Sequence, residues 1–222
     1  MTDPAEQRHN MVESQVRPSD VVDRRIVRAM AAVEREAFVP AAQRAIAYMD
    51  EAVPVEPAGR GPRRCLLAPR VFAKLVQLMR LPDGAAVLDI GGATGYSAAV
   101  LSHMAKSVIA LEQDAGLAQT AGRVLGEQKI ANVKVVAGPH AEGRQLDGPY
   151  DGILLNGQVP DIPAALLDQL KDGGRLVAIL ASGPASKAVV VQRGGTQFDR
   201  REDFDAGAAA LPGFERAARF VF

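Results

Sequence analysis

The chain has 222 residues, enough for one domain with a sizeable hydrophobic core. Its 26 basic and 26 acidic residues cancel, so we expect neither nucleic acid nor an anionic membrane as a partner. Cys65 is the only cysteine and there are three histidines, which excludes an intramolecular disulfide, argues against a metal site and favours a reducing, cytoplasmic setting. No run approaches the ~18 apolar residues of a membrane span, and the polar N-terminus does not resemble a signal peptide.

The first eighty residues favour helices. We expect Ser19 to cap one helix and Pro69 to open another, because both residue types are typical of helix starts and apolar residues follow at helical spacing. Between them, residues 51–64 are rich in Pro and Gly and predict a loop with at most one short strand. We therefore expect residues 1–80 to form a helical extension packed on a core of residues 81–222, as one structural domain overall.

From residue 85 onward, short apolar runs alternate with helical stretches. Strands are expected at 85–90, 107–112, 133–137, 151–155 and 174–181. Such alternation predicts an α/β fold with a mostly parallel, doubly wound sheet covered on both faces. At the end of the chain, "KAVVVQR" (187–193) and "FERAARFVF" (214–222) are expected to pair as antiparallel strands, with "AGAAALPG" (206–213) as a connector.

A glycine corner follows the first of these strands, in "VLDIGGATGYSAAVL" (87–101). A dinucleotide site would need glycines at 93 and 96, but these positions hold Ala93 and Tyr96. No Lys followed by Ser or Thr comes after Gly95, which excludes the phosphate loop of nucleoside triphosphatases. The corner offers a tight turn and bare backbone, at the edge of the sheet where ligands of such folds bind.

Two acids end neighbouring strands beside this corner. Asp89 comes just before the glycines, where a carboxylate can interact with an ammonium group, and Glu112 ends the strand "VIALE", where it can accept hydrogen bonds from ribose hydroxyls. A ligand with an amino-acid end and a ribose, but without phosphate, is S-adenosylmethionine. The sequence therefore predicts S-adenosylmethionine as the cofactor.

Several longer stretches resemble the protein-L-isoaspartate (D-aspartate) O-methyltransferase family over nearly the whole chain. They are "MVESQVRPSDVVDRRIVRAMAAVEREAFVP", "VLDIGGATGYSAAVLS", "YDGILLNGQVPDIPAALLDQLKDGGRLV" and the closing "RFVF". The resemblance implies a Rossmann-like methyltransferase that esterifies the α-carboxylate of isoaspartyl residues, so that a succinimide forms again and the backbone is repaired. With it, the expected cofactor-binding residues are Asp89, Gly91, Gly92, Gly95, Tyr96, Glu112, Gly138 and His140.

The sequence departs from the family pattern where the acceptor would bind. The family's Thr-Ile-Ser-Gln-Pro-like segment, whose hydroxyl lies by the methyl group and the acceptor carboxylate, corresponds here to "CLLAP" (65–69). Leu67 and Ala68 stand at the serine and glutamine positions, and neither side chain can donate a hydrogen bond. The family's Gly-Asp-Gly corner reads Gly138-Pro139-His140, and Ala93 replaces a frequent glycine.

The sequence therefore does not identify the catalytic residues. In the acceptor loop the candidates are Leu67 by position and Arg60, Arg63 and Arg64 by chemistry, since a guanidinium can hold a carboxylate bidentately. Cys65, without a neighbouring base, is expected to be an inert thiol. Three functions remain: a carboxyl methyltransferase of this family, weakened or redirected; a methyltransferase with another acceptor; and a noncatalytic S-adenosylmethionine-binding or scaffold protein. The sequence leaves the oligomeric state open.

Overall fold

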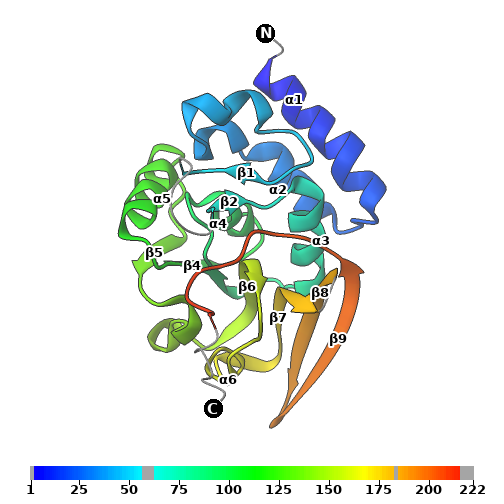
Figure 1. Cartoon of the computed structure of the whole chain (residues 1–222), viewed down its shortest axis with the longest axis vertical. Helices are drawn as coiled ribbons and strands as arrows, with labels where there is room; N and C mark the ends of the chain where they lie inside the picture. The colour runs from blue at the N-terminus through cyan, green and yellow to red at the C-terminus, as the bar shows by residue number, and fades with distance from the viewer. Residues whose placement is uncertain (1–2, 57–62, 183–184, 216–222) are drawn as a thin grey trace, which may run out of the picture.

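A seven-stranded sheet forms the centre of the computed structural model, which describes residues 3–56, 63–182 and 185–215 (Figure 1). The strands lie side by side in the order β5-β4-β3-β6-β7-β8-β9. Their bounds are β3 Ala86–Ile90, β4 Ser107–Glu112, β5 Val133–Ala137, β6 Tyr150–Val159, β7 Leu170–Ser182, β8 Ala185–Gly194 and β9 Gln197–Asp205. The five strands from β5 to β7 are parallel, and β8 and β9 are antiparallel additions.

The strand order reverses at β3, which has β4 on one side and β6 on the other. Ligands of doubly wound sheets bind beyond the carboxyl ends of the strands at such a switch point. The glycine corner after β3 lies there, so the predicted parallel core and the position of the corner are both confirmed.

The central strands β3, β4 and β6 are buried on both faces of the sheet. Successive residues of a strand point to opposite faces, so neighbours belong to different hydrophobic clusters. Val87 belongs to one hydrophobic cluster, together with residues of the N-terminal helices. Its neighbour Leu88 belongs to the other, with Leu166, Leu211 and Phe214. The helices that complete these layers are α3 Pro69–Met79, α4 Tyr96–Ser102, α5 Ala115–Glu127 and α6 Ala164–Leu167.

The N-terminal extension is helical, as predicted, and lies across the upper part of the molecule in Figure 1. Its elements are α1 Pro4–Met11, a π-helical turn Val12–Val16, α2 Arg24–Ala32, three 3-10 turns (Arg17–Ser19, Arg35–Phe38, Ala41–Ile46) and the short antiparallel pair β1 Val53–Pro54 and β2 Cys65–Leu66. Pro69 occupies the first turn of α3, as expected.

The predicted cap at Ser19 is wrong. Helix α2 begins at Arg24, and the Asp23 side chain accepts a hydrogen bond from the Arg25 backbone N–H. The Ser19 hydroxyl instead donates to the Gln15 carbonyl within the preceding turn. Val22, the second of two apolar residues between Ser19 and the start of α2, is 81% exposed.

The predicted partner of β8 is also wrong. Strand β8 pairs with β7 on one side and with β9, Gln197–Asp205, on the other, and β9 lies between the two stretches expected to pair. Residues 214 and 215 are not in a strand, and residues 216–222 lie outside the described part of the chain. The antiparallel end of the sheet is therefore confirmed, but its second strand comes earlier.

The segment after β9, residues 206–214, crosses the carboxyl ends of the parallel strands (Figure 1). It exchanges backbone hydrogen bonds with Gln158 at the end of β6 and reaches His140 beyond β5, where the Pro212 carbonyl bonds the imidazole. The stretch expected to be a simple connector thus covers the glycine corner.

No helix in the described residues is long and apolar enough to cross a membrane. This finding matches the expectation from hydropathy along the sequence.

Gly174 gives a test of the packing between β6 and β7. A methyl group at this position would lie 2.9 Å from the backbone oxygens of Lys171 and Tyr150, which cannot move without disturbing the strands. We expect Gly174→Ala to lower the free energy of unfolding by about 1–3 kcal/mol, the usual range for overpacking.

Urea denaturation followed by circular dichroism measures this change. Gly194→Ala is the matched control, because nothing lies within 4 Å of a methyl group at the end of β8. Equal unfolding midpoints for the two variants would contradict the close contact at Gly174.

Candidate functional site

The glycine corner places bare backbone next to the carboxylate of Asp89. Gly91 and Gly95 have φ of 70° and 99°, a region that favours glycine, and Gly95 precedes the first residue of α4. A methyl group on Gly92 would lie 2.6 Å from Asp89 Oδ2 and 2.5 Å from Ser97 Oγ. The corner is therefore a cradle that a larger residue would fill.

Asp89 is fully buried, and its hydrogen-bond partners among the described residues are neutral groups. Ser97 Oγ donates to Oδ2 and Asn156 Nδ2 donates to Oδ1, each at 2.6 Å. Burial raises the pKa of Asp89 to about 6, and the nearby charge of Glu112 acts in the same direction. The hydrogen bonds from Ser97 and Asn156 oppose this shift. A cationic ligand would therefore stabilise the charged form of the Asp89 carboxylate.

Glu112 is also buried but has a cationic partner. Arg64 donates to both of its oxygens, at 2.7 Å each, and the backbone N–H groups of Ala93 and Asp114 donate at 3.0 and 3.1 Å. Burial alone would raise the pKa of Glu112, but the contact with His140, whose Nε2 lies 3.3 Å from Oε1, and the hydrogen bonds and charge of Arg64 outweigh burial and lower it. The carboxylate predicted to take the ribose hydroxyls is therefore ionised and held by Arg64.

The three arginines proposed for the acceptor loop differ in their surroundings. Arg64 is 6% exposed, and its Nη2 also donates to the Gly91 carbonyl at 2.9 Å, which puts the guanidinium over the corner. Arg63 is exposed to solvent. Arg60 lies outside the described residues. Of the two that are described, only Arg64 contacts the site.

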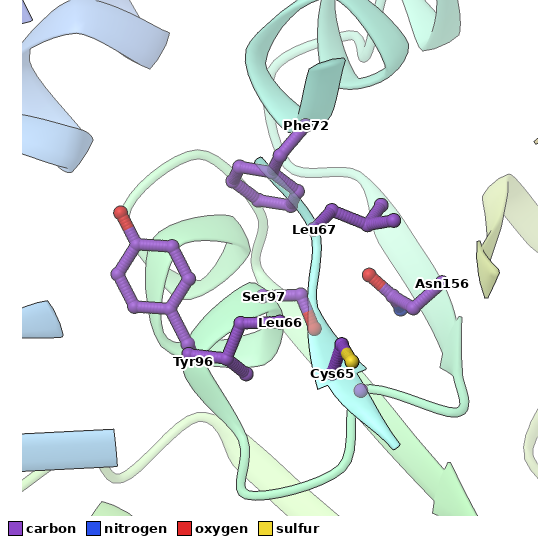
Figure 2. A pocket seen from close by; sticks show the side chains of 8 residues that line it. Cys65, Leu66, Leu67, Phe72, Tyr96, Ser97 and Asn156 are labelled. Carbon is purple, nitrogen blue, oxygen red and sulfur yellow. The ribbon is translucent and has the colours of Figure 1, made fainter. Parts of the chain in front are cut away.

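The acceptor segment closes a small cavity against the corner. Its lining includes Cys65, Leu67, Tyr96, Ser97 and Asn156; in Figure 2 the Asn156 side chain points toward Cys65 and Ser97, whereas the Tyr96 ring points away from them. The cavity measures about 10 Å³, room for a single water. Binding of any larger ligand here requires the lining side chains to move. Burial raises the pKa of the Cys65 thiol, in agreement with the expected inert cysteine.

The backbone of Leu67 is held by a buried arginine that sequence reasoning missed. Arg35 has no exposed surface, donates to the carbonyls of Leu67 and Ala47 at 2.8 and 2.7 Å, and stacks on the Tyr96 ring at 4.6 Å. Within the described residues, no hydrogen bond of ordinary geometry reaches its Nη1 or the Tyr96 hydroxyl. Arg35 thereby ties the acceptor segment to the helix that follows the glycine corner.

The other predicted cofactor residues lie around the same edge. Tyr96 lines the cavity with its ring, and Gly138 follows β5, where its N–H bonds the Glu112 carbonyl at 3.0 Å. His140 is buried: the Gln113 N–H donates to Nε2, so Nδ1 carries the proton shared with the Pro212 carbonyl. Phe214 also stacks on the ring, so the protein itself occupies both ring nitrogens and one face of His140.

Four further residues that the sequence did not single out shape the site. Ser97 and Asn156 hold Asp89, Phe214 covers His140, and Leu211 lies against Gly91, where even a methyl group would collide with it. A polar residue directly after the predicted strand 151–155 was a signal for Asn156. Nothing local in the sequence indicates the positions of Leu211 and Phe214.

Comparisons with known proteins find relatives that match most of the chain. A family model described as "Protein-L-isoaspartate(D-aspartate) O-methyltransferase" matches residues 6–202. The protein-L-isoaspartate O-methyltransferase of Herpetosiphon aurantiacus is 34% identical over 195 residues, covering 88% of this chain and 85% of the relative. That of Methanoregula boonei is 33% identical over 215 residues, covering 96% of each.

The chain belongs to the protein-L-isoaspartate(D-aspartate) O-methyltransferase family. Enzymes of this family transfer a methyl group from S-adenosylmethionine to a carboxylate, so the expected cofactor, enzyme class and Rossmann-like fold are confirmed. A solved protein-L-isoaspartate O-methyltransferase has a TM-score of 0.84 at 23% identity, covering 93% of this chain and 67% of the other. A Plasmodium falciparum structure, described as a candidate enzyme of this kind in complex with S-adenosyl-L-homocysteine, has a TM-score of 0.76 at 18% identity, covering 96% and 100%.

The departures from the family pattern lie at this site. Leu67 faces the small cavity, where the family has a hydroxyl, and Ala68 lies on the other side of the segment in a larger, open cleft. Ala93 takes the left-handed conformation, with φ of 54°, in which a glycine would be relaxed. Its N–H nevertheless reaches Glu112, so this substitution preserves the corner.

Arg35 offers a test of how the acceptor segment is held. We expect Arg35→Ala to lower the free energy of unfolding by about 3 kcal/mol, because it leaves a large buried cavity and two carbonyls without their donor. Arg28→Ala, on the exposed side of α2, is the control and should change stability by less than about 0.5 kcal/mol. Chemical denaturation measures both, and equal effects would show that the Leu67 contact contributes nothing.

Proposed function

We propose that this chain methylates the α-carboxylate of isoaspartyl residues in proteins, with S-adenosylmethionine bound at the glycine corner. The observation that carries the proposal is the meeting of two buried acids, Asp89 and Glu112, at the switch point of the sheet, beside a cavity closed by the acceptor segment. Family membership supports a carboxylate as the acceptor and disfavours an unrelated acceptor or a scaffold role.

The residues at the corner fit the cofactor by their chemistry. Asp89, whose described partners are neutral, would take the ammonium of the amino-acid end, and the bare backbone at Gly91 and Gly92 would allow close approach once Leu211 leaves Gly91. Glu112 would take the ribose hydroxyls, and Gly138 lies next to it for the adenine side. His140 would act through its neighbours, since both ring nitrogens are already bonded.

The reaction makes few demands on side chains. S-adenosylmethionine supplies an activated methyl group: a carboxylate oxygen forms the new bond to carbon as the C–S bond breaks, and the electron pair stays on sulfur. The acceptor is already ionised, so no proton needs to move. Orientation and exclusion of water can therefore provide most of the rate, and Leu66, Leu67 and Phe72 give the cavity apolar walls.

The rest of the acceptor polypeptide fits the open cleft on the other side of the acceptor segment. This cleft measures about 660 Å³ and is lined by Ala68, by Arg70 and Lys74 of α3, and by Phe204 at the end of β9. Because Leu67 lines the small cavity and Ala68 lines the cleft, a chain lying in the cleft can direct one carboxylate past the segment.

The setting that we propose is the cytoplasm, with proteins or peptides rather than nucleic acid as partners. A single cysteine fits a reducing compartment, and equal numbers of acidic and basic residues give no field for a polyanion. The helical residues 1–80 and the core would act together, since one hydrophobic cluster joins them.

A methyl-transfer assay tests the proposal. Radiolabelled S-adenosylmethionine is incubated with the protein and an isoaspartyl peptide, beside the same peptide with a normal aspartyl residue. We expect label in base-labile ester only with the isoaspartyl peptide, because a carboxylate placed as an α-carboxylate fits beside the segment. Cofactor binding without transfer to either peptide would contradict the proposed acceptor, and equal transfer to both would contradict the specificity.

The pKa of Asp89 predicts how cofactor binding depends on pH. Below pH 6 the buried carboxyl takes up a proton, and a neutral acid no longer attracts the ammonium of S-adenosylhomocysteine. With a pKa of about 6, the affinity should fall about tenfold between pH 7 and pH 5, as one linked proton requires. Glu112, the charged neighbour, stays ionised over this range because its pKa is lowered.

Calorimetric titration with S-adenosylhomocysteine at several pH values measures this dependence. The matched control is Asp89→Asn, which keeps the shape of the side chain but cannot titrate. We expect weaker binding with a flat pH profile in that variant. A profile that is as steep in Asp89→Asn as in the wild type would assign the titration to another group.

A further inference from the structure

Arg64 is the one cation that the described residues place over the glycine corner, and it is held by the carboxylate expected to receive the cofactor. We infer that Arg64 exchanges partners: it leaves Glu112 when Glu112 accepts the ribose hydroxyls, and it then holds the acceptor carboxylate. The inference rests on the proposed function, and it makes Arg64 the residue that recognises the acceptor.

The contacts of Glu112 require such an exchange. Arg64 donates one hydrogen bond to each carboxylate oxygen of Glu112, both at 2.7 Å. The backbone N–H groups of Ala93 and Asp114 each donate one further bond, to Oε2 and Oε1 respectively. A pair of ribose hydroxyls would have to donate to the same two oxygens. Arg64 must therefore give up at least one of its bonds before Glu112 can accept them.

Glu112 can release Arg64 without being left unsatisfied. The two backbone N–H donors belong to the fixed corner and to the start of α5, so they remain after the exchange. With the ribose hydroxyls in place of the guanidinium, each oxygen again has two donors. The charge that loses its partner is that of Arg64.

An arginine released from a buried carboxylate needs another anion, because an unpaired buried charge is strongly unfavourable. Arg64 directly precedes Cys65, whose side chain lines the small cavity, and no described side chain that lines the cavity is cationic. Arg35 cannot substitute, since it is fully buried and bound to two carbonyls. An acceptor carboxylate that enters beside the glycine corner as the small cavity opens offers Arg64 the same bidentate geometry as Glu112.

This exchange also accounts for the departures at Leu67 and Ala68. These side chains cannot donate hydrogen bonds to the acceptor, so the donors must come from elsewhere. Arg64 supplies two, but only after the cofactor has taken its place on Glu112. Cofactor and acceptor should therefore strengthen each other's binding, and by linkage the strengthening is the same in both directions.

Calorimetry tests the exchange through binding rather than turnover. S-adenosylhomocysteine is titrated into the wild type, Arg64→Ala and Arg64→Lys, each with and without saturating isoaspartyl peptide. In Arg64→Ala we expect tighter binding of S-adenosylhomocysteine alone, by roughly five-fold or more, the lower end for coupled sites. The peptide should tighten this binding in the wild type and have no effect in Arg64→Ala.

Two controls make the result specific. Arg63→Ala removes the exposed neighbouring arginine and should behave as the wild type. Arg64→Lys keeps a cation in the buried pair, so it should fold even if Arg64→Ala does not, and it should show intermediate affinity and weaker coupling because it lacks the fork.

The outcomes separate this inference from the proposed function. If the wild type binds S-adenosylhomocysteine and methylates the peptide, but the Arg64 variants bind it no more tightly and keep the full coupling, the exchange is wrong and the function stands. The same effects in Arg63→Ala would also overturn the exchange. Absence of S-adenosylhomocysteine binding in every form would overturn the proposed function itself.

Discussion

The buried carboxylate of Glu112 is the constraint on which the rest of the site depends. A charge in the interior is tolerated only where donors satisfy it, and three separate segments provide them: Arg64 before the acceptor segment, Ala93 in the glycine corner and Asp114 at the start of α5. Each of these segments borders the small cavity or the cofactor edge. Glu112, at the end of β4, therefore fixes the positions of these segments relative to one another.

The contrast between Asp89 and Glu112 shows how the site divides its charges. Both acids are buried at the ends of adjacent strands, yet burial raises the pKa of Asp89, whereas in Glu112 the partners overcome burial and lower it. The difference comes from the donors, which are neutral at Asp89 and include a guanidinium at Glu112. A cationic ligand is thus drawn to Asp89, while Glu112 offers hydrogen-bond acceptance only in exchange for Arg64.

The sequence predicted the parallel core well, because strands buried on both faces leave a strong apolar signal bounded by turns. It failed at β9, whose residues are almost all exposed and mostly charged, so neither an apolar run nor alternation marks this edge strand. It failed also at the start of α2, where Ser19 and Asp23 are both good caps and only the fold decides between them. In both cases the deciding contacts are not local.

The same limit separates the predicted part of the site from the missed part. Asp89, Glu112 and the corner are found because each ends or follows a strand, but the partner of Glu112 lies 48 residues away and could not be chosen among three arginines. Leu211 lies still farther along the chain from Gly91, and Arg35 lies 32 residues before Leu67. Burial, which pattern alone does not give, is what distinguishes Arg64 from Arg63.

These long-range contacts also explain how the acceptor segment can lose its polar side chains and keep its place. Leu67 is held through its carbonyl by Arg35, and Leu66 through pairing with Val53, so the segment is positioned by backbone contacts that do not depend on side-chain identity. In a segment held in this way, position and hydrogen bonding to the acceptor are separate properties. Replacement of serine and glutamine by Leu67 and Ala68 then changes the chemistry of the cavity wall without moving it, and a nearby cation can supply the lost donors.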